Sequence, residues 1–260
     1  MTRQRLGQNF LTDSGWQRKI LAALPRKPGE TWVEIGAGHG EMTPFLAGDG
    51  RRVVAIETDA VLARHLQSSA GLKDWPGIEV VHADVLETNL AELGGEKFRV
   101  YGNLPYYITS PILHQLFLAA GHIESIHIVV QLEVAARIAA KPSRHDYGYL
   151  SVACQFYANP EIVMKIPPGA FRPIPRVTSA LVQMTLPGQR AWLDISDEKR
   201  FLGFVHICFS QKRKTLRNNL RAIASDERIY EALAERGLPA HTRAEQLTVA
   251  QLASLFKNLR

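Results

Sequence analysis

Short apolar runs alternate with amphipathic stretches over the first half of the chain. The runs that predict strands lie at 31–35, 52–56, 78–81, 98–101 and 126–130. The predicted helices lie at 13–24, at 41–47, at 59–68 and from Ser110-Pro111 onward. Strands that alternate with helices favour a parallel sheet with right-handed crossovers, so the pattern predicts an α/β fold.

The pattern changes after Ile162. Two late strands, at 163–166 and 177–186, flank a proline-rich loop, and a hairpin that closes the sheet accounts for them. Leu186-Pro187-Gly188 is a natural boundary, and three helices are predicted beyond it, at 197–210, 226–236 and 249–259. We therefore expect one domain at 1–187 and a small helical domain at 188–260.

Composition changes this picture only in the charge. A chain of 260 residues with 46% hydrophobic and 22% charged residues is typical of globular proteins. From Gly188 onward, 13 Lys and Arg stand against 8 Asp and Glu, which accounts for five of the net +6 charges. A basic surface favours a polyanion such as nucleic acid, and an ordinary solvated surface is the alternative.

Cysteine and histidine usage points to a reducing compartment. Cys154 and Cys208 lie in apolar surroundings, which predicts buried free thiols. The nine histidines are scattered without zinc-site spacing, so no metal is expected. The sequence has no apolar run of membrane-spanning length and no apolar core of a secretion signal near its start. We expect a cytoplasmic protein that does not enter a membrane.

Three glycines, Gly36, Gly38 and Gly40, follow the predicted strand 31–35 and precede a helix. Such glycines let a ligand approach backbone amides at a helix N-terminus. A dinucleotide-binding loop would have its third glycine at position 41, where Glu41 is a poor neighbour for a pyrophosphate. The run favours a nucleoside without phosphates, and a tight turn is the alternative.

Acidic residues follow the next two predicted strands. Glu57 comes about 20 residues after the glycines, where a carboxylate accepts hydrogen bonds from ribose hydroxyls. Asp84 follows the strand at 78–81 and is placed to accept a hydrogen bond from an adenine amine. A helix cap or a solvated turn is the alternative for each. The ends of parallel strands face one crevice, so we expect these acids to meet the glycines there.

The strand at 98–101 is followed by Asn103-Leu104-Pro105-Tyr106. Proline holds the preceding residue extended, which keeps the nearby carbonyls out of a helix. The Asn103 amide supplies an acceptor, and Tyr106 supplies a stacking face. This combination predicts a pocket for the exocyclic amine of a flat base.

Together these motifs resemble a class I (Rossmann-like) S-adenosylmethionine-dependent methyltransferase that acts on an amino nitrogen, with helices on both faces of the sheet. The stretches 8–11, 103–112 and 167–177 are similar to the KsgA (RsmA) family of ribosomal RNA small-subunit adenine N6,N6-dimethyltransferases. The resemblance extends from about Gln8 to the C-terminus. Erm methyltransferases, which modify large-subunit rRNA, share part of these motifs.

The resemblance implies specific roles. The residues expected to line the S-adenosylmethionine site are Asn9, Leu11, Gly36, Gly38, Glu57, Asp84 and Asn103. Asn103, the Leu104 carbonyl and Tyr106, with Pro105 between them, are expected to hold the target adenine, and Phe171 to pack on its other face. Tyr107 stands where many members have Asn. The implied substrate is a pair of adjacent adenosines near the 3′ end of small-subunit (16S) rRNA, within an immature small subunit.

Basic residues are the expected RNA contacts. They are Arg3, Arg5, Lys212, Arg213, Lys214, Arg217 and Arg221. Positions 214, 217 and 221 are predicted to share one helix face, which favours phosphate contact over a solvated face. Three alternatives remain at this point: an Erm-type methyltransferase, a nucleotide-dependent oxidoreductase and a non-catalytic RNA-binding assembly factor. A monomer is expected.

Overall fold

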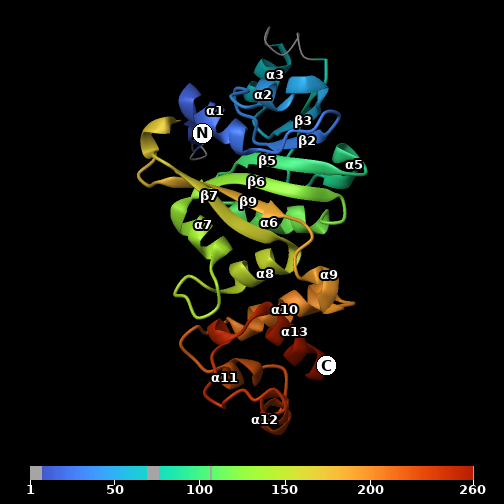
Figure 1. Ribbon diagram of the computed structural model, residues 1–260, viewed down its shortest axis with the longest axis vertical. Coiled ribbons are helices and arrows are strands. Elements are labelled where there is room, and N and C mark those ends of the chain that lie inside the picture. The colour runs from blue at the N-terminus through green and yellow to red at the C-terminus, as the bar shows by residue number, and fades with distance from the viewer. Residues whose placement is uncertain (1–7, 69–75, 106, 260) are drawn as a thin grey trace, which may run out of the picture. The chain divides into compact units, whose positions relative to one another are not determined.

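The computed structural model describes residues 8–68, 76–105 and 107–259 (Figure 1). The chain divides into two units, which are described separately below. The first runs to Ala135 and includes Glu161–Leu186, and the second comprises Ala136–Pro160 and Pro187–Arg260. The last division follows Leu186, one residue before the expected boundary. Residues 136–160, however, group with the C-terminal helices, and the functional roles expected for the two domains stay a prediction.

A seven-stranded sheet forms the centre of the first unit, with strand order β4-β3-β2-β5-β6-β9-β7. The strands are β2 (Thr31–Ile35), β3 (Arg52–Glu57), β4 (Ile78–His82), β5 (Phe98–Asn103), β6 (Ile123–Gln131), β7 (Asn159–Ile166) and β9 (Ser179–Thr185). β2 to β6 pair in parallel, whereas β9 runs antiparallel to β6. The five early strands are thus confirmed, and the late pair lies together at one edge of a mixed sheet.

Helices connect the strands of this sheet. They are α1 (Ser14–Ala23), α2 (Thr43–Leu46), α3 (Ala60–Ser68), α5 (Leu90–Gly94), α6 (Thr109–Leu118) and α7 (Leu132–Ala139), with short 3-10 turns at Gly48–Gly50 and Pro168–Ala170. Asp13 caps α1 as predicted, because its carboxylate accepts the Trp16 amide at 2.9 Å. α6 begins at Thr109, so the prediction that Ser110 caps this helix is wrong, although Pro111 still lies in its first turn.

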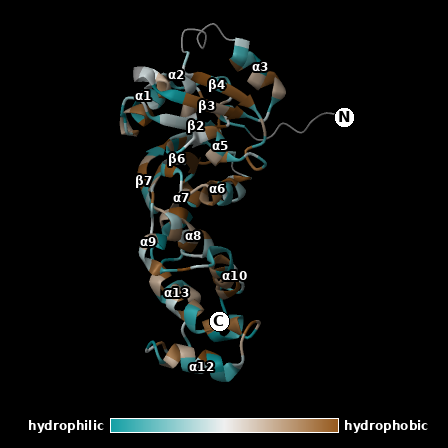
Figure 2. Cartoon of the chain, turned by 90° about the vertical axis from the view of Figure 1, so that its right-hand side faces the viewer, coloured by the Kyte–Doolittle hydropathy of each residue, from teal (hydrophilic) through white to brown (hydrophobic). Residues whose placement is uncertain are grey.

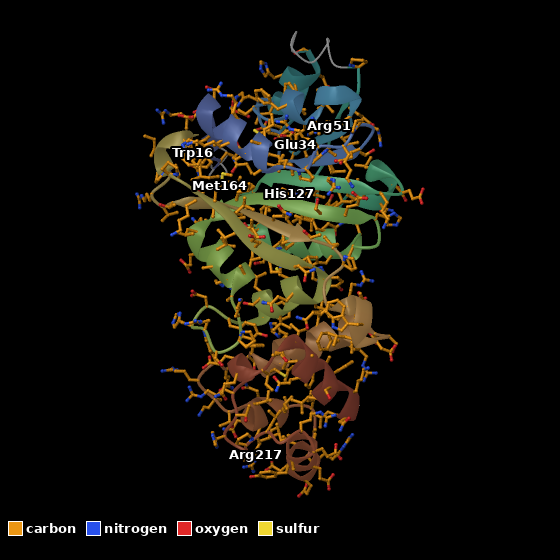
Figure 3. All side chains as sticks on the ribbon, in the orientation of Figure 1. Trp16, Glu34, Arg51, His127, Met164 and Arg217 are labelled. Atoms are coloured by element: carbon orange, nitrogen blue, oxygen red, sulfur yellow. The ribbon has the colours of Figure 1, made fainter. Side chains whose placement is uncertain are left out.

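A two-stranded ribbon joins distant parts of the sequence. β1 (Phe10–Leu11) pairs antiparallel with β8 (Phe171–Arg172), and the amides of Thr12 and Asp13 donate to the Ala170 carbonyl. The ribbon contributes Leu11 and Phe171 to a core cluster, and Trp16 and Met164, both labelled in Figure 3, are partly buried and pack against it. Figure 2 shows apolar colouring over β3 and β4, and Val53–Ile56 of β3 is fully buried.

The second unit is helical. Its helices are α8 (Tyr149–Tyr157), α9 (Arg190–Leu193), α10 (Glu198–Cys208), α11 (Leu216–Leu220), α12 (Asp226–Ala234) and α13 (Val249–Asn258), with a 3-10 turn at Ala244–Gln246. α8 was not predicted; Phe156 on it packs against Phe201 of α10, with ring centroids 5.0 Å apart. Cys154 and Cys208 are buried and free, as predicted, and burial raises the pKa of both thiols. Within the described parts, no helix combines the length and apolarity needed to cross a membrane.

A buried arginine holds the central strands together. Arg99 on β5 forms ion pairs with Glu30 at 2.9 Å and Glu124 at 2.8 Å, and donates to the Ser125 hydroxyl at 2.8 Å. The Arg99 and Glu30 side chains are each only 10% exposed. Removal of one partner of a buried pair leaves an uncompensated charge, so this contact stabilises the strands whose far ends form the site.

We predict that Arg99→Leu lowers the free energy of unfolding by about 3–5 kcal/mol, because it leaves the buried Glu30 carboxylate without its ion-pair partner. Arg52→Leu is the matched control. Arg52 pairs with Glu79 at 2.9 Å, but both side chains are about half exposed, so the expected loss is about 0–1 kcal/mol. Urea unfolding of both variants measures the difference, and equal losses would contradict the role given to Arg99.

Candidate active site

One hollow opens where β2, β3 and β5 end. Its lining residues are Gln8, Asn9, Phe10, Gly36, Gly38, Glu57, Thr58, Asn103, Leu104 and Pro105. The glycine loop, the acid at the end of β3 and the amide at the end of β5 therefore meet, as the sequence predicts. Phe10 and Thr58 had no predicted role, although Phe10 lies beside Asn9 in a motif already singled out.

A second hollow, of about 340 Å³, adjoins the first and shares Gly36, Thr58 and Pro105 with it. This volume lies in the range of small-molecule sites. Asp84 lines this second hollow, and its side chain accepts the Leu86 amide at 2.9 Å. The predicted acids thus line two connected hollows: Glu57 lies in the first and Asp84 in the second.

The glycine loop gives the hollow an exposed backbone wall. Gly36 has φ +69°, and a Cβ placed there would meet no atom within 4 Å, so the space over it is open. Gly38 has φ +62°, and its Cβ would lie 3.0 Å from the Phe10 ring. Positive φ is costly for other residues, so glycine is required both for the turn and for the close approach.

The Glu57 carboxylate is held in place by backbone donors. One oxygen accepts the Gly38 amide and the other accepts the Asp59 amide, both at 2.9 Å. The side chain is 2% exposed. Asp59 caps α3 by accepting the amides of Val61 and Leu62, which was the alternative role considered for an acid here. Glu57 is therefore a fixed acceptor at the position where a ribose hydroxyl is expected.

Asn103 has its amide oriented by the N-terminal segment. Its Nδ2 donates to the Asn9 carbonyl at 2.7 Å, which makes Oδ1 the atom that can accept from a bound ligand. The next amide, of Leu104, donates to the Val129 carbonyl at 3.0 Å and extends the pairing of β5 with β6. Asn103 and Leu104 thus leave the sheet in a fixed geometry at the wall of the hollow.

Two predicted site residues lie in the core instead. Phe171 was expected to stack on the target base; its side chain is fully buried and lines neither hollow, so the stacking role stays a prediction. Leu11 is 2% exposed and lines neither hollow. The reason is shared: the two residues face each other in the β1–β8 ribbon, whose apolar side chains pack on the core cluster.

Some predictions cannot be placed. Tyr106, Arg3 and Arg5 lie outside the described residues. Tyr107 lines the second hollow and is 58% exposed. Among the described residues, no three His, Cys, Asp or Glu side chains gather in a metal-binding arrangement.

The prediction that Lys214, Arg217 and Arg221 share one helix face is wrong in part. Thr215 caps α11 by accepting the Asn218 amide, so the helix begins at Leu216, and Lys212, Arg213 and Lys214 precede it. The side chain of Lys212 donates to the His145 carbonyl. The three cations therefore lie on a turn and not on a helical stripe.

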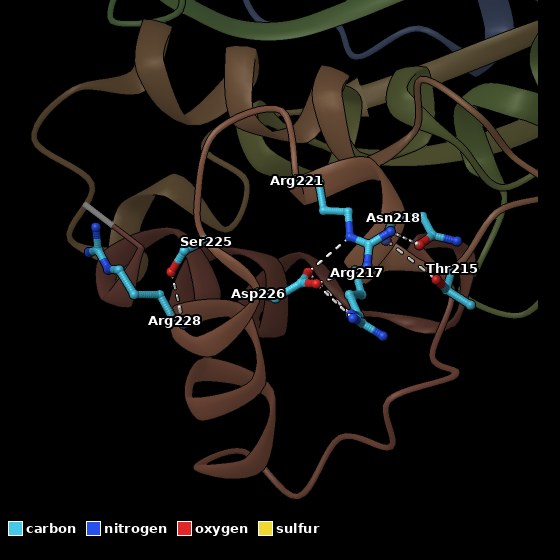
Figure 4. Close-up of polar contacts among 7 residues, drawn as sticks. All are labelled: Thr215, Arg217, Asn218, Arg221, Ser225, Asp226 and Arg228. Carbon is cyan, nitrogen blue, oxygen red and sulfur yellow. Dashed lines mark hydrogen bonds and ion pairs between the residues drawn. The ribbon is translucent and has the colours of Figure 1, made fainter.

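Arg217 and Arg221 share an acidic partner on the next helix. Both guanidinium groups contact Asp226, at 2.7 and 2.8 Å (Figure 4). Hydrogen bonds from Arg221 and Arg217 hold the pKa of Asp226 well below its usual range. Arg217 also lies over the Tyr230 ring, 4.4 Å from its centroid. These two arginines join α11 to α12, a contact that a charge count along the sequence does not reveal.

Comparison with known proteins shows the family and excludes one of the remaining alternatives. A sequence model of the family described as "Ribosomal RNA adenine dimethylase" matches residues 1–260. The chain belongs to the ribosomal RNA adenine dimethylase family. Its fold is that of class I S-adenosylmethionine-dependent methyltransferases, and S-adenosylmethionine is its cofactor; the alternative of a nucleotide-dependent oxidoreductase is wrong.

Individual relatives agree with the family assignment. "Ribosomal RNA small subunit methyltransferase A" of Acidobacterium capsulatum is 43% identical over 98% of this chain and 90% of that protein. The protein of the same name from Koribacter versatilis is 41% identical over 98% of this chain and 94% of that protein.

Solved structures share the fold over nearly the whole chain. A dimethyladenosine transferase from Plasmodium falciparum has a TM-score of 0.81, with 21% identity and 95% of each chain covered. The 23S rRNA methyltransferase ErmE has a TM-score of 0.73, with 28% identity, over 96% of this chain and 99% of that one.

This dimethylase also has a buried acid beneath its glycine loop. Glu34 of β2 lies two residues before Gly36 and opposite Tyr101 of β5. Its side chain is labelled within the sheet in Figure 3 and is 3% exposed, and within the described chain its Oε2 atom has no hydrogen-bond partner. Burial raises the pKa of Glu34 to about 8, and the negative charges of Glu41 and Glu57 add to the effect. Glu34 is therefore mostly protonated at pH 7.

We predict that Glu34→Gln flattens the pH dependence of stability. An unfolded Glu ionises near 4.5, whereas the folded dimethylase holds the Glu34 proton up to about pH 8. The folded state then binds more protons across this interval, so wild-type stability falls as pH rises through it. Urea unfolding at pH 5 and pH 8 measures both slopes. Parallel curves for wild type and Glu34→Gln would show that Glu34 ionises normally.

Proposed function

We propose that this enzyme methylates two adjacent adenosines in a hairpin loop near the 3′ end of small-subunit (16S) rRNA. Each adenosine becomes N6,N6-dimethyladenosine. One observation carries the choice of subunit: relatives named as small-subunit methyltransferases are 36–43% identical over nearly the whole chain, whereas ErmE is 28% identical. An Erm-type large-subunit substrate is the less supported alternative.

S-adenosylmethionine supplies an electrophilic methyl group on a positively charged sulfonium. Glu57 is the residue placed to accept from its ribose, Asp84 to accept from its adenine, and the backbone around Gly36 and Gly38 to lie against it. The open space over Gly36 and the fixed carboxylate of Glu57 fit such a nucleoside. Leu11 does not line the hollow, and a role for it in cofactor binding stays a prediction.

The chain's own task at the reacting nitrogen is to orient it. An adenine amine is a poor nucleophile because its lone pair is delocalised into the ring. Acceptors at Asn103 Oδ1 and the Leu104 carbonyl bind the amine hydrogens and favour a more pyramidal nitrogen. Well-oriented reactants gain about 7–11 kcal/mol of the barrier, so positioning supplies most of the rate. The nitrogen becomes acidic as it gains the methyl group, so no strong base is required beforehand.

The target base has to leave its RNA stack to enter the hollow. Extrusion costs a few kcal/mol, and stacking in the pocket offsets part of this cost. Tyr106 and Phe171 stay the predicted stacking residues, although the Phe171 side chain is buried in the core of the described structure.

We place the enzyme in the cytoplasm, acting as a monomer on an immature small subunit and serving as a late assembly factor. A purely structural assembly role without catalysis is less well supported, because the glycine loop, Glu57, Asp84 and Asn103 are all intact. Labelled S-adenosylmethionine with unmethylated small subunits tests the activity, and mapping of the labelled nucleotides tests the site.

We predict that Asn103→Ala lowers methyl transfer by at least about 100-fold, the usual loss when one preorganised hydrogen-bonding group is removed from a reacting centre. RNA affinity should stay within a few-fold, since the phosphate contacts remain. Asn89→Ala, an exposed asparagine of the same unit, is the control and should retain full turnover. Normal turnover by Asn103→Ala would refute the amine pocket.

We predict that replacing Lys212, Arg213 and Lys214 with Ala weakens RNA binding and flattens its salt dependence, because fewer counterions are released. Arg217 is left intact, since its guanidinium already binds Asp226. Replacement of the exposed Arg18, Arg26 and Lys27 removes the same charge and should leave the slope unchanged. Filter binding from 50 to 200 mM salt gives the salt dependence of RNA affinity for both variants. Equal slopes for the two variants would contradict the assignment of Lys212, Arg213 and Lys214 as RNA contacts.

A further inference from the structure

The loop between β8 and β9 lies in a stretch of the first unit that contains basic residues and no acidic ones. Residues 162–188 contain Lys165, Arg172 and Arg176 and no Asp or Glu. The loop itself spans 173–178; Arg172, which precedes it, and Arg176, which lies within it, are both exposed. A surplus of cations without acidic partners in the same stretch favours a polyanion.

Between these arginines the loop exposes a large apolar side chain. Ile174 is 61% exposed and stands between Pro173 and Pro175. Proline fixes φ on both sides of it, and Pro175 is buried, so the loop is anchored where Ile174 is presented. Single exposed apolar residues are common, so exposure of Ile174 alone does not indicate a function.

The pairing of the β1–β8 ribbon directs the start of this loop toward the active-site hollow. Arg172 lies opposite Phe10 in the antiparallel β1–β8 ribbon, so the chain beyond Arg172 continues toward Asn9 and Gln8. All three β1-side residues line the hollow. The Arg172 guanidinium donates to the carbonyls of Gly169 and Phe171, at 3.2 and 2.8 Å, which holds its charge at the base of the loop.

We propose that Ile174 is a wedge that enters the rRNA hairpin loop at the place a target adenosine vacates, while Arg172 and Arg176 bind the flanking phosphates. Apolar side chains inserted between bases replace lost stacking and lower the cost of extrusion. Ile174 is thus a positioning residue that makes the amine reachable. The inference rests on the proposed function and adds the residue that promotes base extrusion.

The test uses the full-length enzyme and unmethylated small subunits assembled with two forms of the rRNA hairpin. One form is intact, and the other carries an abasic site beside a target adenosine, which removes its stacking partner. On intact subunits, Ile174→Ala should lower kcat/KM about tenfold, since extrusion costs a few kcal/mol. On abasic subunits the loss should fall below about twofold, because little stacking remains to be broken.

Three controls separate a wedge from a structural role. Ile174→Leu keeps an apolar side chain of equal size and should restore most of the rate. Leu118→Ala, which truncates a side chain of α6 that is 71% exposed, should leave kcat/KM unchanged on both forms of the subunit. S-adenosylhomocysteine affinity and the melting temperature of Ile174→Ala should match the wild type.

A fluorescence measurement reports extrusion without chemistry. With 2-aminopurine in place of one target adenosine, wild-type enzyme should raise the fluorescence as the base unstacks, and Ile174→Ala should not. Equal losses on both subunit forms, or no loss on intact subunits, would overturn the wedge while wild-type transfer upholds the proposed function. Absence of transfer by the wild type on both forms would overturn the function and the wedge with it.

Discussion

The hydrogen bond from the Asn103 side chain to the Asn9 carbonyl, at 2.7 Å, is the contact on which the site depends. It joins residues 94 positions apart and sets which end of the amide faces the hollow. The two partners are held independently, Asn103 by its place at the end of β5 and Asn9 by the β1–β8 ribbon that follows it. Because both partners are held in place, the Asn103 amide needs little reorganisation when it accepts a hydrogen bond from a base amine.

The electrostatics of the site follow from how its acids are held. The Glu57 side chain accepts hydrogen bonds from two backbone amides, which fix it as an acceptor at the end of β3. Burial raises the pKa of Glu34 to about 8, so this acid keeps its proton near neutral pH, and its Oε2 atom has no hydrogen-bond partner within the described residues. The two buried acids of this sheet thus differ in how their side chains are held. Near the start of β5, Arg99 forms ion pairs with Glu30 and Glu124 and so stabilises the ends of the strands that lie opposite the site.

Local pattern predicts the framework well because each strand and helix is encoded in neighbouring residues. The strands at 31–35, 52–57 and 98–103 follow from apolar runs, and the ends of parallel strands then bring Gly36, Glu57 and Asn103 together. Contacts between distant residues are where prediction failed. The burial of Phe171 depends on its pairing with Leu11, and the position of the Arg217 guanidinium depends on its ion pair with Asp226. The proline-rich loop has no periodicity, so nothing in its sequence distinguishes the inward Phe171 from the outward Ile174.

The central claim is that one amide at the end of β5 receives the amine while the end of β3 holds the cofactor ribose. A crystal structure of the enzyme with S-adenosylhomocysteine and an adenosine-containing RNA hairpin tests it most directly. The account predicts the adenine N6 at about 3 Å from Asn103 Oδ1 and the ribose hydroxyls on Glu57. An adenine whose amine points away from Asn103, or a cofactor bound away from Glu57, would contradict it.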